Sequence, residues 1–73
     1  MMIIIDSILE GPFHGFNGGQ VFKFTNGQIW EQAEYKYNYH YAYRPNAQII
    51  EDQGNYYLQV NGMSDRVKVK KVR

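Results

Sequence analysis

A run of seventeen residues without glycine or proline, from Gln28 to Arg44, most constrains how this 73-residue chain can fold. As one straight β-strand at ~3.3 Å per residue, the run would span about 56 Å. A domain of this length has a radius of gyration of about 11 Å and hence a diameter of roughly 30 Å. The run therefore cannot be one straight strand inside one domain. It must coil around a barrel, break near Ala33, or project beyond the body of the protein.

Alternation of apolar and polar residues with period two recurs along the chain, whereas no segment keeps the spacing of an amphipathic helix. Turn residues separate the alternating runs, which is typical of all-β proteins. Outside the long run, strands are predicted over 2–10, 47–51, 56–60 and 66–72, and the glycine-rich segment Gly11–Gly19 is predicted to be a loop. The sequence thus predicts one all-β domain over residues 1–73, a small SH3-like barrel of five to six antiparallel strands with one long bent strand.

The clearest hairpin signal is the Asn-Gly pair at 26–27, with β-forming residues on both sides. Two registers are open. A two-residue turn would pair Phe24 with Ile29, whereas a type I turn with a glycine bulge would place Phe22 opposite Trp30. We favour the bulged register, because it gathers both phenylalanines and the tryptophan on one apolar face.

Composition narrows the function classes. The chain has no cysteine, which excludes disulfides and Cys-based metal sites, and its two histidines lack ligand spacing. We therefore expect no metal and no cofactor, and we expect oligomerisation to compensate for the small core. The longest apolar run is far below the ~20 residues of a membrane span, and no basic region precedes it. These features favour a cytoplasmic protein without a membrane partner.

Tyrosine occupies every second position from Tyr35 to Tyr43, within the stretch EYKYNYHYAYRP. A core this small is expected to take two or three of the five rings, together with Leu58, Val60, Val67 and Val69, because buried hydroxyls need partners. The remaining rings should be exposed to solvent or packed against another molecule. Tyrosine is enriched at protein interfaces, so the candidate interface residues are Tyr39, Tyr41 and Tyr43.

Basic residues lie beside the tyrosines and in the last strand, and five polar side chains are candidates for binding a ligand or nucleic acid. They are Lys36, His40, Arg44, Lys68 and Lys70. Aromatic rings next to cations are a common means of binding single-stranded nucleic acid. The lysines of the last strand have a simpler interpretation, since lysine on a terminal strand discourages pairing between sheet edges. His40 is conceivable as a general base, but a solvated strand histidine is the simpler interpretation.

The segment FKFTNGQIWEQ, the tyrosine run ending in Arg-Pro, YYLQVNGM and VKVKKV together resemble a family of small uncharacterised bacterial β domains. Its pattern is F-x-F/L-x-N-G-Q-x-W-x-Q followed by a tyrosine-alternating strand, and the likeness covers about residues 8–72. Similar sequences occur as proteins encoded on integron cassettes. The resemblance implies an SH3-like fold and a mobile genetic element, and it carries no catalytic residues.

We therefore expect a non-enzymatic binding module that forms a homo-oligomer through its tyrosine-rich strand. The alternative is a protein that binds single-stranded nucleic acid through tyrosine, lysine and arginine. A remote alternative is an enzyme with its site at an oligomer pore, like the small SH3-like dihydrofolate reductases of integrons. Their Val-Gln-Ile-Tyr strand is matched here only by Gln48 and Ile49.

Overall fold

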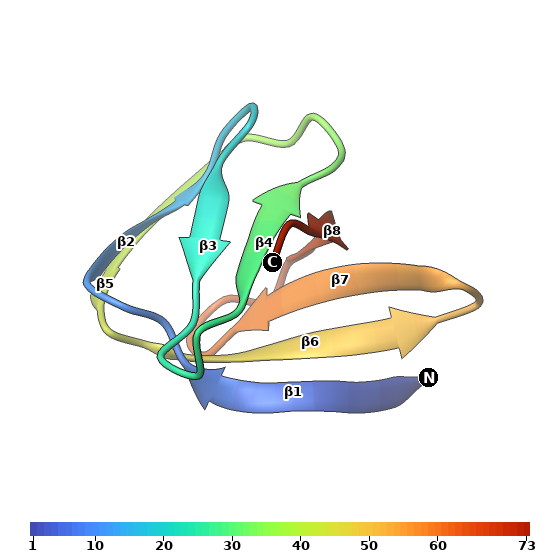
Figure 1. The fold of residues 1–73 in the computed structure, drawn as a ribbon. Coiled ribbons are helices and arrows are strands. Elements are labelled where there is room, and N and C mark those ends of the chain that lie inside the picture. The colour runs from blue at the N-terminus through green and yellow to red at the C-terminus, as the bar shows by residue number, and fades with distance from the viewer.

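The computed structural model describes all 73 residues and contains eight β-strands and no helix. In chain order the strands are β1 (Met2–Ile8), β2 (Pro12–Phe16), β3 (Val21–Lys23), β4 (Ile29–Gln32), β5 (Asn38–Tyr43), β6 (Asn46–Asp52), β7 (Asn55–Val60) and β8 (Arg66–Lys71). Six of them form an antiparallel sheet in the order β1-β6-β7-β8-β4-β3, and β2 pairs with β5 in a second sheet (Figure 1). The predicted all-β class is confirmed.

The hairpin of β3 and β4 has the bulged register that the sequence favours. Phe22 pairs with Trp30, and the amide of Gly27 donates to the carbonyl of Phe24 across the turn. Gly27 has a φ of 93°, the left-handed conformation that a glycine bulge requires. Phe22, Phe24 and Trp30 are all buried, so the prediction of one apolar face is confirmed.

The long run from residue 28 to 44 is divided into two strands by a break near Ala33. β4 ends at Gln32, five residues turn the chain, and β5 begins at Asn38 in the other sheet. The molecule measures 29 × 25 × 22 Å, so neither half of the run projects beyond it. Size excluded one straight strand, and a break near Ala33 was one of the three arrangements that this left open.

The prediction of a loop over residues 11–19 is wrong in its first half. Pro12–Phe16 forms β2, which pairs with β5 and buries Phe13 and Phe16. The register shifts between Phe13 and Gly15, where glycine with a φ of 91° passes close to β5. Glycine here permits strand pairing instead of ending it. The chain therefore has more strands than the five to six expected, because β2 forms and the long run divides.

The two edges of the six-stranded sheet approach each other at one end. Leu9, just after β1, bridges to Phe24, just after β3. The amide of Thr25 donates to the carbonyl of Ile8 at 2.8 Å, and that of Glu10 to Lys23 at the same distance. These contacts curl the sheet around its apolar face.

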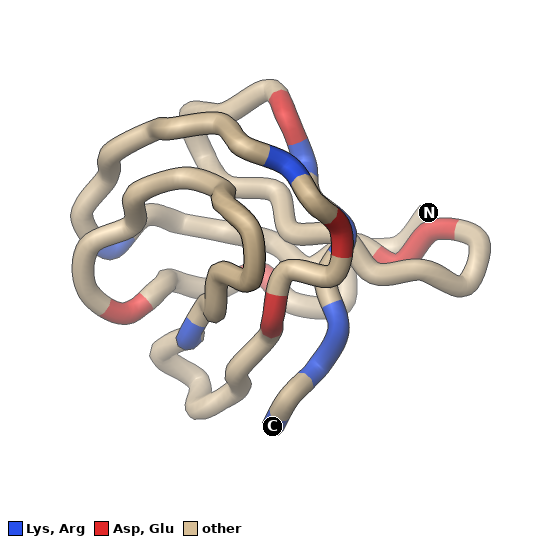
Figure 2. Tube along the Cα trace, turned by 90° about the horizontal axis from the view of Figure 1, so that it is seen from above, with Lys and Arg blue, Asp and Glu red and all other residues tan.

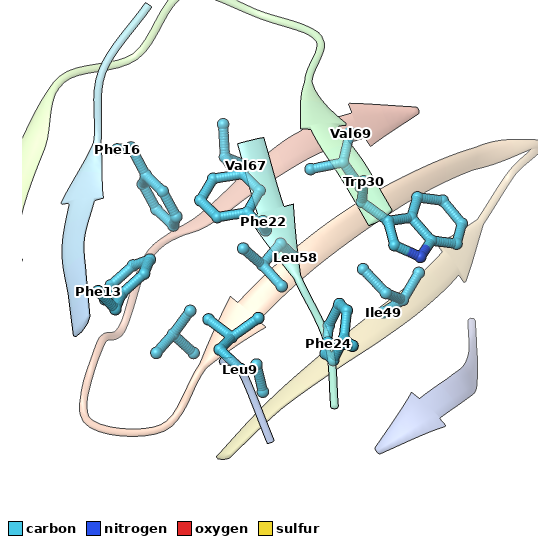
Figure 3. Packing of buried hydrophobic residues seen from close by; sticks show 12 residues of the cluster. Leu9, Phe13, Phe16, Phe22, Phe24, Trp30, Ile49, Leu58, Val67 and Val69 are labelled. Atoms are coloured by element: carbon cyan, nitrogen blue, oxygen red, sulfur yellow. The ribbon is translucent and has the colours of Figure 1, made fainter. Parts of the chain in front are cut away.

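One hydrophobic cluster fills the space between the two sheets (Figure 3). Its members are Leu9, Phe13, Phe16, Phe22, Phe24, Trp30, Ala47, Ile49, Leu58, Val60, Val67 and Val69. The predicted core positions on β7 and β8 and the predicted burial of Trp30 are confirmed. Three phenylalanines, at 13, 16 and 22, pack with centroid distances of 6.0 to 6.2 Å. No tyrosine belongs to the cluster.

Gly15→Ala tests the close approach of β2 to β5. A Cβ at this position would lie against the carbonyl oxygen of Asn38 and 2.6 Å from the amide nitrogen of His40. We expect a loss of about 2 kcal/mol or more in the free energy of unfolding, from the clash and the positive φ together. Urea denaturation measures it.

Gly19→Ala is the matched control, because Gly19 also has a positive φ, 78°, but a Cβ there meets nothing within 4 Å. Only the backbone strain remains, at about 1 kcal/mol. Equal losses in the two variants would show that the approach of the two strands is not tight.

Candidate functional site

The side chains of β5 alternate between a core-facing and a solvent-facing row. Ala42 faces Phe13 across the ladder and packs against the core, and Asn38 and His40 are half-buried on the same side. The tyrosines point the other way. All five of the run are exposed, from 54% for Tyr41 to 85% for Tyr35. The expectation that two or three rings enter the core is wrong.

Phenylalanine explains why the tyrosines stay outside. Phe13 and Phe16, from the segment predicted to be a loop, fill the core on the inner side of the β2–β5 pair, where β5 adds the small side chain of Ala42. Phenylalanine has no hydroxyl that needs a partner, and it is therefore the less costly aromatic residue to bury.

The exposed row continues across β2. Pro12 pairs with Tyr43 in the register, and the ring of His14 lies 5.4 Å from that of Tyr41 at an angle of 55°. The tyrosine face, as we name it, consists of Pro12, His14, Tyr39, Tyr41 and Tyr43. The three predicted interface residues thus lie together, whereas Pro12 and His14 of β2 were not predicted. The alternation of Pro12 and His14 with Phe13 and Gly15 was the signal that could have revealed them.

The buried carboxamide of Gln32 determines how the chain turns into the tyrosine strand. Its Oε1 accepts from the amide of Asn17 at 3.2 Å, and its Nε2 donates to the carbonyls of Glu34 at 2.9 Å and Lys36 at 3.0 Å. One side chain therefore joins the loop after β2 to the corner between β4 and β5. Tyr35 and Tyr37 belong to this corner rather than to the strand.

The predicted basic residues do not gather around the tyrosine face. Lys36 Nζ donates to the carbonyl of Arg66 at 2.8 Å and lies 3.9 Å from Asp65, and Lys70 pairs with Glu31 at 3.7 Å. The side chain of Glu34 accepts from the backbone amide of Lys68. Basic and acidic residues alternate around the molecule rather than forming one basic side (Figure 2).

Of the other two candidates, His40 lies within β5 and Arg44 directly follows it. Arg44 is exposed directly after Tyr43, and its amide donates to Gly11. His40 faces inward, where its Nε2 would lie 3.3 Å from a Cβ at Gly62, beside a small hollow that Met63 and Ser64 also line. The structure thus divides the five predicted ligand-binding residues among three places.

A groove of about 410 Å³ lies across one end of β1, β6 and β7. Its polar lining is one carboxylate and four carboxamides, from Asp6, Asn46, Gln48, Gln59 and Asn61. Gln59 is engaged, because its Nε2 donates to the carbonyls of Met63 and Asp65. The groove brings together hydrogen-bonding groups but no second ionisable side chain.

No cluster of three or more histidine, cysteine or acidic residues with the geometry of a metal site is present. The structure contains no helix long and apolar enough to cross a membrane. Comparison of the chain with models of known protein families, with curated proteins and with solved structures found no match.

Gln32→Leu tests the role of the buried carboxamide. The substitution leaves the amide of Asn17 and the carbonyls of Glu34 and Lys36 without their partner, in a partly buried place. We expect a loss of about 3 kcal/mol in the free energy of unfolding. Faster amide hydrogen exchange at Asn17 should accompany it.

Gln48→Leu is the control, since Gln48 is half-buried on a strand but its side chain makes no hydrogen bond. Its free energy of unfolding should stay within about 0.5 kcal/mol of the parent protein. If both substitutions had this small effect, the corner would not depend on Gln32.

Proposed function

We propose that this protein is a non-enzymatic interaction module that self-associates through the tyrosine face. The observation that carries the proposal is the row of Tyr39, Tyr41 and Tyr43, which are 63%, 54% and 69% exposed on a strand whose other face is fastened to the core. Rings held on a rigid strand lose little conformational freedom on binding, which is why tyrosine favours interfaces.

The area of the face is small for a stable complex. A fully exposed tyrosine offers ~200 Å², so the three rings present about 400 Å². This equals the largest apolar patch of a typical monomer and is about half of the ~800 Å² per partner in a stable complex. Pro12 and His14 enlarge it. We therefore infer a reversible dimer of modest affinity rather than an obligate one.

The charges of the region favour a second copy as the partner. No lysine, aspartate or glutamate belongs to the tyrosine face, and Arg44 is only at its end. Two copies can therefore approach face to face without repulsion between like charges, which would otherwise oppose the contact.

Binding of single-stranded nucleic acid is the competing proposal, and Arg44 at the end of the row is the feature that supports it. Phosphate contacts need cations beside the stacking rings. Lys68 and Lys70 are on β8, outside the tyrosine face, and Lys70 is paired with Glu31. This arrangement favours a protein partner.

The double variant Tyr39→Ser/Tyr41→Ser tests self-association. Because both rings are exposed, the variant should fold with nearly unchanged stability. Sedimentation velocity across a concentration series should show a reversible dimer for the parent protein and a dissociation constant at least tenfold higher for the variant, because the face loses most of its aromatic area.

Tyr35→Ser is the matched control, since Tyr35 is the most exposed ring and lies outside the tyrosine face. It should dimerise like the parent protein. A parent protein that stays monomeric at every concentration would contradict the proposal.

Fluorescence anisotropy with a labelled oligothymidine distinguishes the two proposals. Self-association through an uncharged face predicts no binding at moderate salt. Binding that falls steeply with salt and is lost in Lys68→Glu/Lys70→Glu would instead favour the nucleic-acid alternative.

A further inference from the structure

The outer edge of β1 is largely unpaired. One edge of the strand pairs with β6 along its length, whereas the other receives a hydrogen bond at Ile8, from the amide of Thr25. From there toward its start, β1 diverges from β4 (Figure 1). Met2, Ile3 and Ile4 are exposed along this part. The strand contains no lysine or proline, which often protect an edge from pairing; its one charged residue is Asp6, and its pairing with β6 shifts in register between Ile3 and Ile5.

A cleft opens where β1 and β4 diverge. Its volume is about 270 Å³, room for one ring-sized group. The lining residues are Ile4, Ile5, Gln28, Trp30, Tyr56 and Lys71. The indole of Trp30 lies at the margin of the core cluster, on the side of β1 (Figure 3).

Two polar groups of the cleft that have no partner in the protein are the hydrogen-bond donors of Gln28 and Lys71. The Oε1 of Gln28 accepts from Trp30 Nε1 at 3.1 Å, and the Nε2 of Gln28 donates to no group of the protein. Lys71 is the only charged residue of the lining and makes no ion pair, unlike its neighbour Lys70. The rings of Trp30 and Tyr56 lie 5.5 Å apart and form an apolar wall. An apolar group with a carboxylate beside it would complement this lining.

We propose that the cleft binds an extended acidic peptide, which pairs with the free edge of β1. Main-chain donors and acceptors along β1 would bind its backbone, as in other cases of strand addition. One aromatic or large aliphatic side chain would insert beside Trp30, and an acidic residue two positions away, on the same side of the peptide, would reach Lys71. This site is separate from the tyrosine face, which lies on the β2–β5 pair at the other side of Figure 1.

The fluorescence of Trp30 reports on the cleft directly, because it is the only tryptophan of the chain. The probe is the synthetic peptide acetyl-TETFTET-amide, in which a glutamate lies two residues from the phenylalanine on either side. We expect its addition to change the tryptophan emission in a saturable manner. A peptide with proline after the phenylalanine should bind at least tenfold more weakly, because proline removes a main-chain donor and hinders strand pairing.

Lys71→Glu should weaken binding of the acidic peptide by about fivefold or more, since it replaces attraction by repulsion at the cleft. Lys70→Glu is the matched control: the two lysines are adjacent on β8 and point to opposite faces, so Lys70 does not line the cleft. It should leave binding unchanged. Tyr39→Ser/Tyr41→Ser should also leave it unchanged, which separates this test from that of self-association.

Three results would overturn the inference. The first is that neither peptide changes the fluorescence emission of Trp30. The second is equal binding of the proline peptide, which would exclude pairing with β1. The third is equal binding of 3-phenylpropionate, which would identify the cleft as a site for small aromatic acids instead of a peptide.

Discussion

The buried side chain of Gln32 is the interaction on which the arrangement of the two sheets depends. A carboxamide has two donors and an acceptor, and this one uses its oxygen for the loop after β2 and its nitrogen for the corner after β4. Without these partners, its burial among apolar groups would cost several kcal/mol, so the corner and the loop are held in one geometry. That geometry directs β5 away from β4 and onto β2.

Two kinds of aromatic residue then divide the second sheet between them. The phenylalanines of β2 fill the inner face, and the tyrosines of β5 fill the outer face. Gly15 allows the strands to come close enough for both rows to align, since any Cβ there would strike β5. A small core thereby supports a rigid aromatic surface that it does not have to bury. This support makes the tyrosine face a suitable interface.

The proposed contacts use different physical features of opposite sides of the molecule. On the β2–β5 pair, exposed rings offer area without charge, which suits an identical partner. Between β1 and β4, unpaired main-chain groups, the Trp30 and Tyr56 rings and the ammonium of Lys71 suit an extended acidic segment. The two sides share no residue. A protein with both could hold a copy of itself and a second chain at once.

The sequence by itself determined the features that local chemistry or chain length decides. The Asn-Gly turn and its apolar neighbours favoured the register that pairs Phe22 with Trp30, and the length of the run after Gln28 excluded one straight strand. The core valines of β8 followed from alternation. Only the tertiary structure decided that Gly15 lies within a strand, that all five tyrosines from Tyr35 to Tyr43 are exposed, and that Lys36 and Lys70 lie beside carboxylates. These outcomes depend on which residues, distant in sequence, pack together in space. Alternation within one strand indicates only that its two faces differ and does not indicate which face packs against the core.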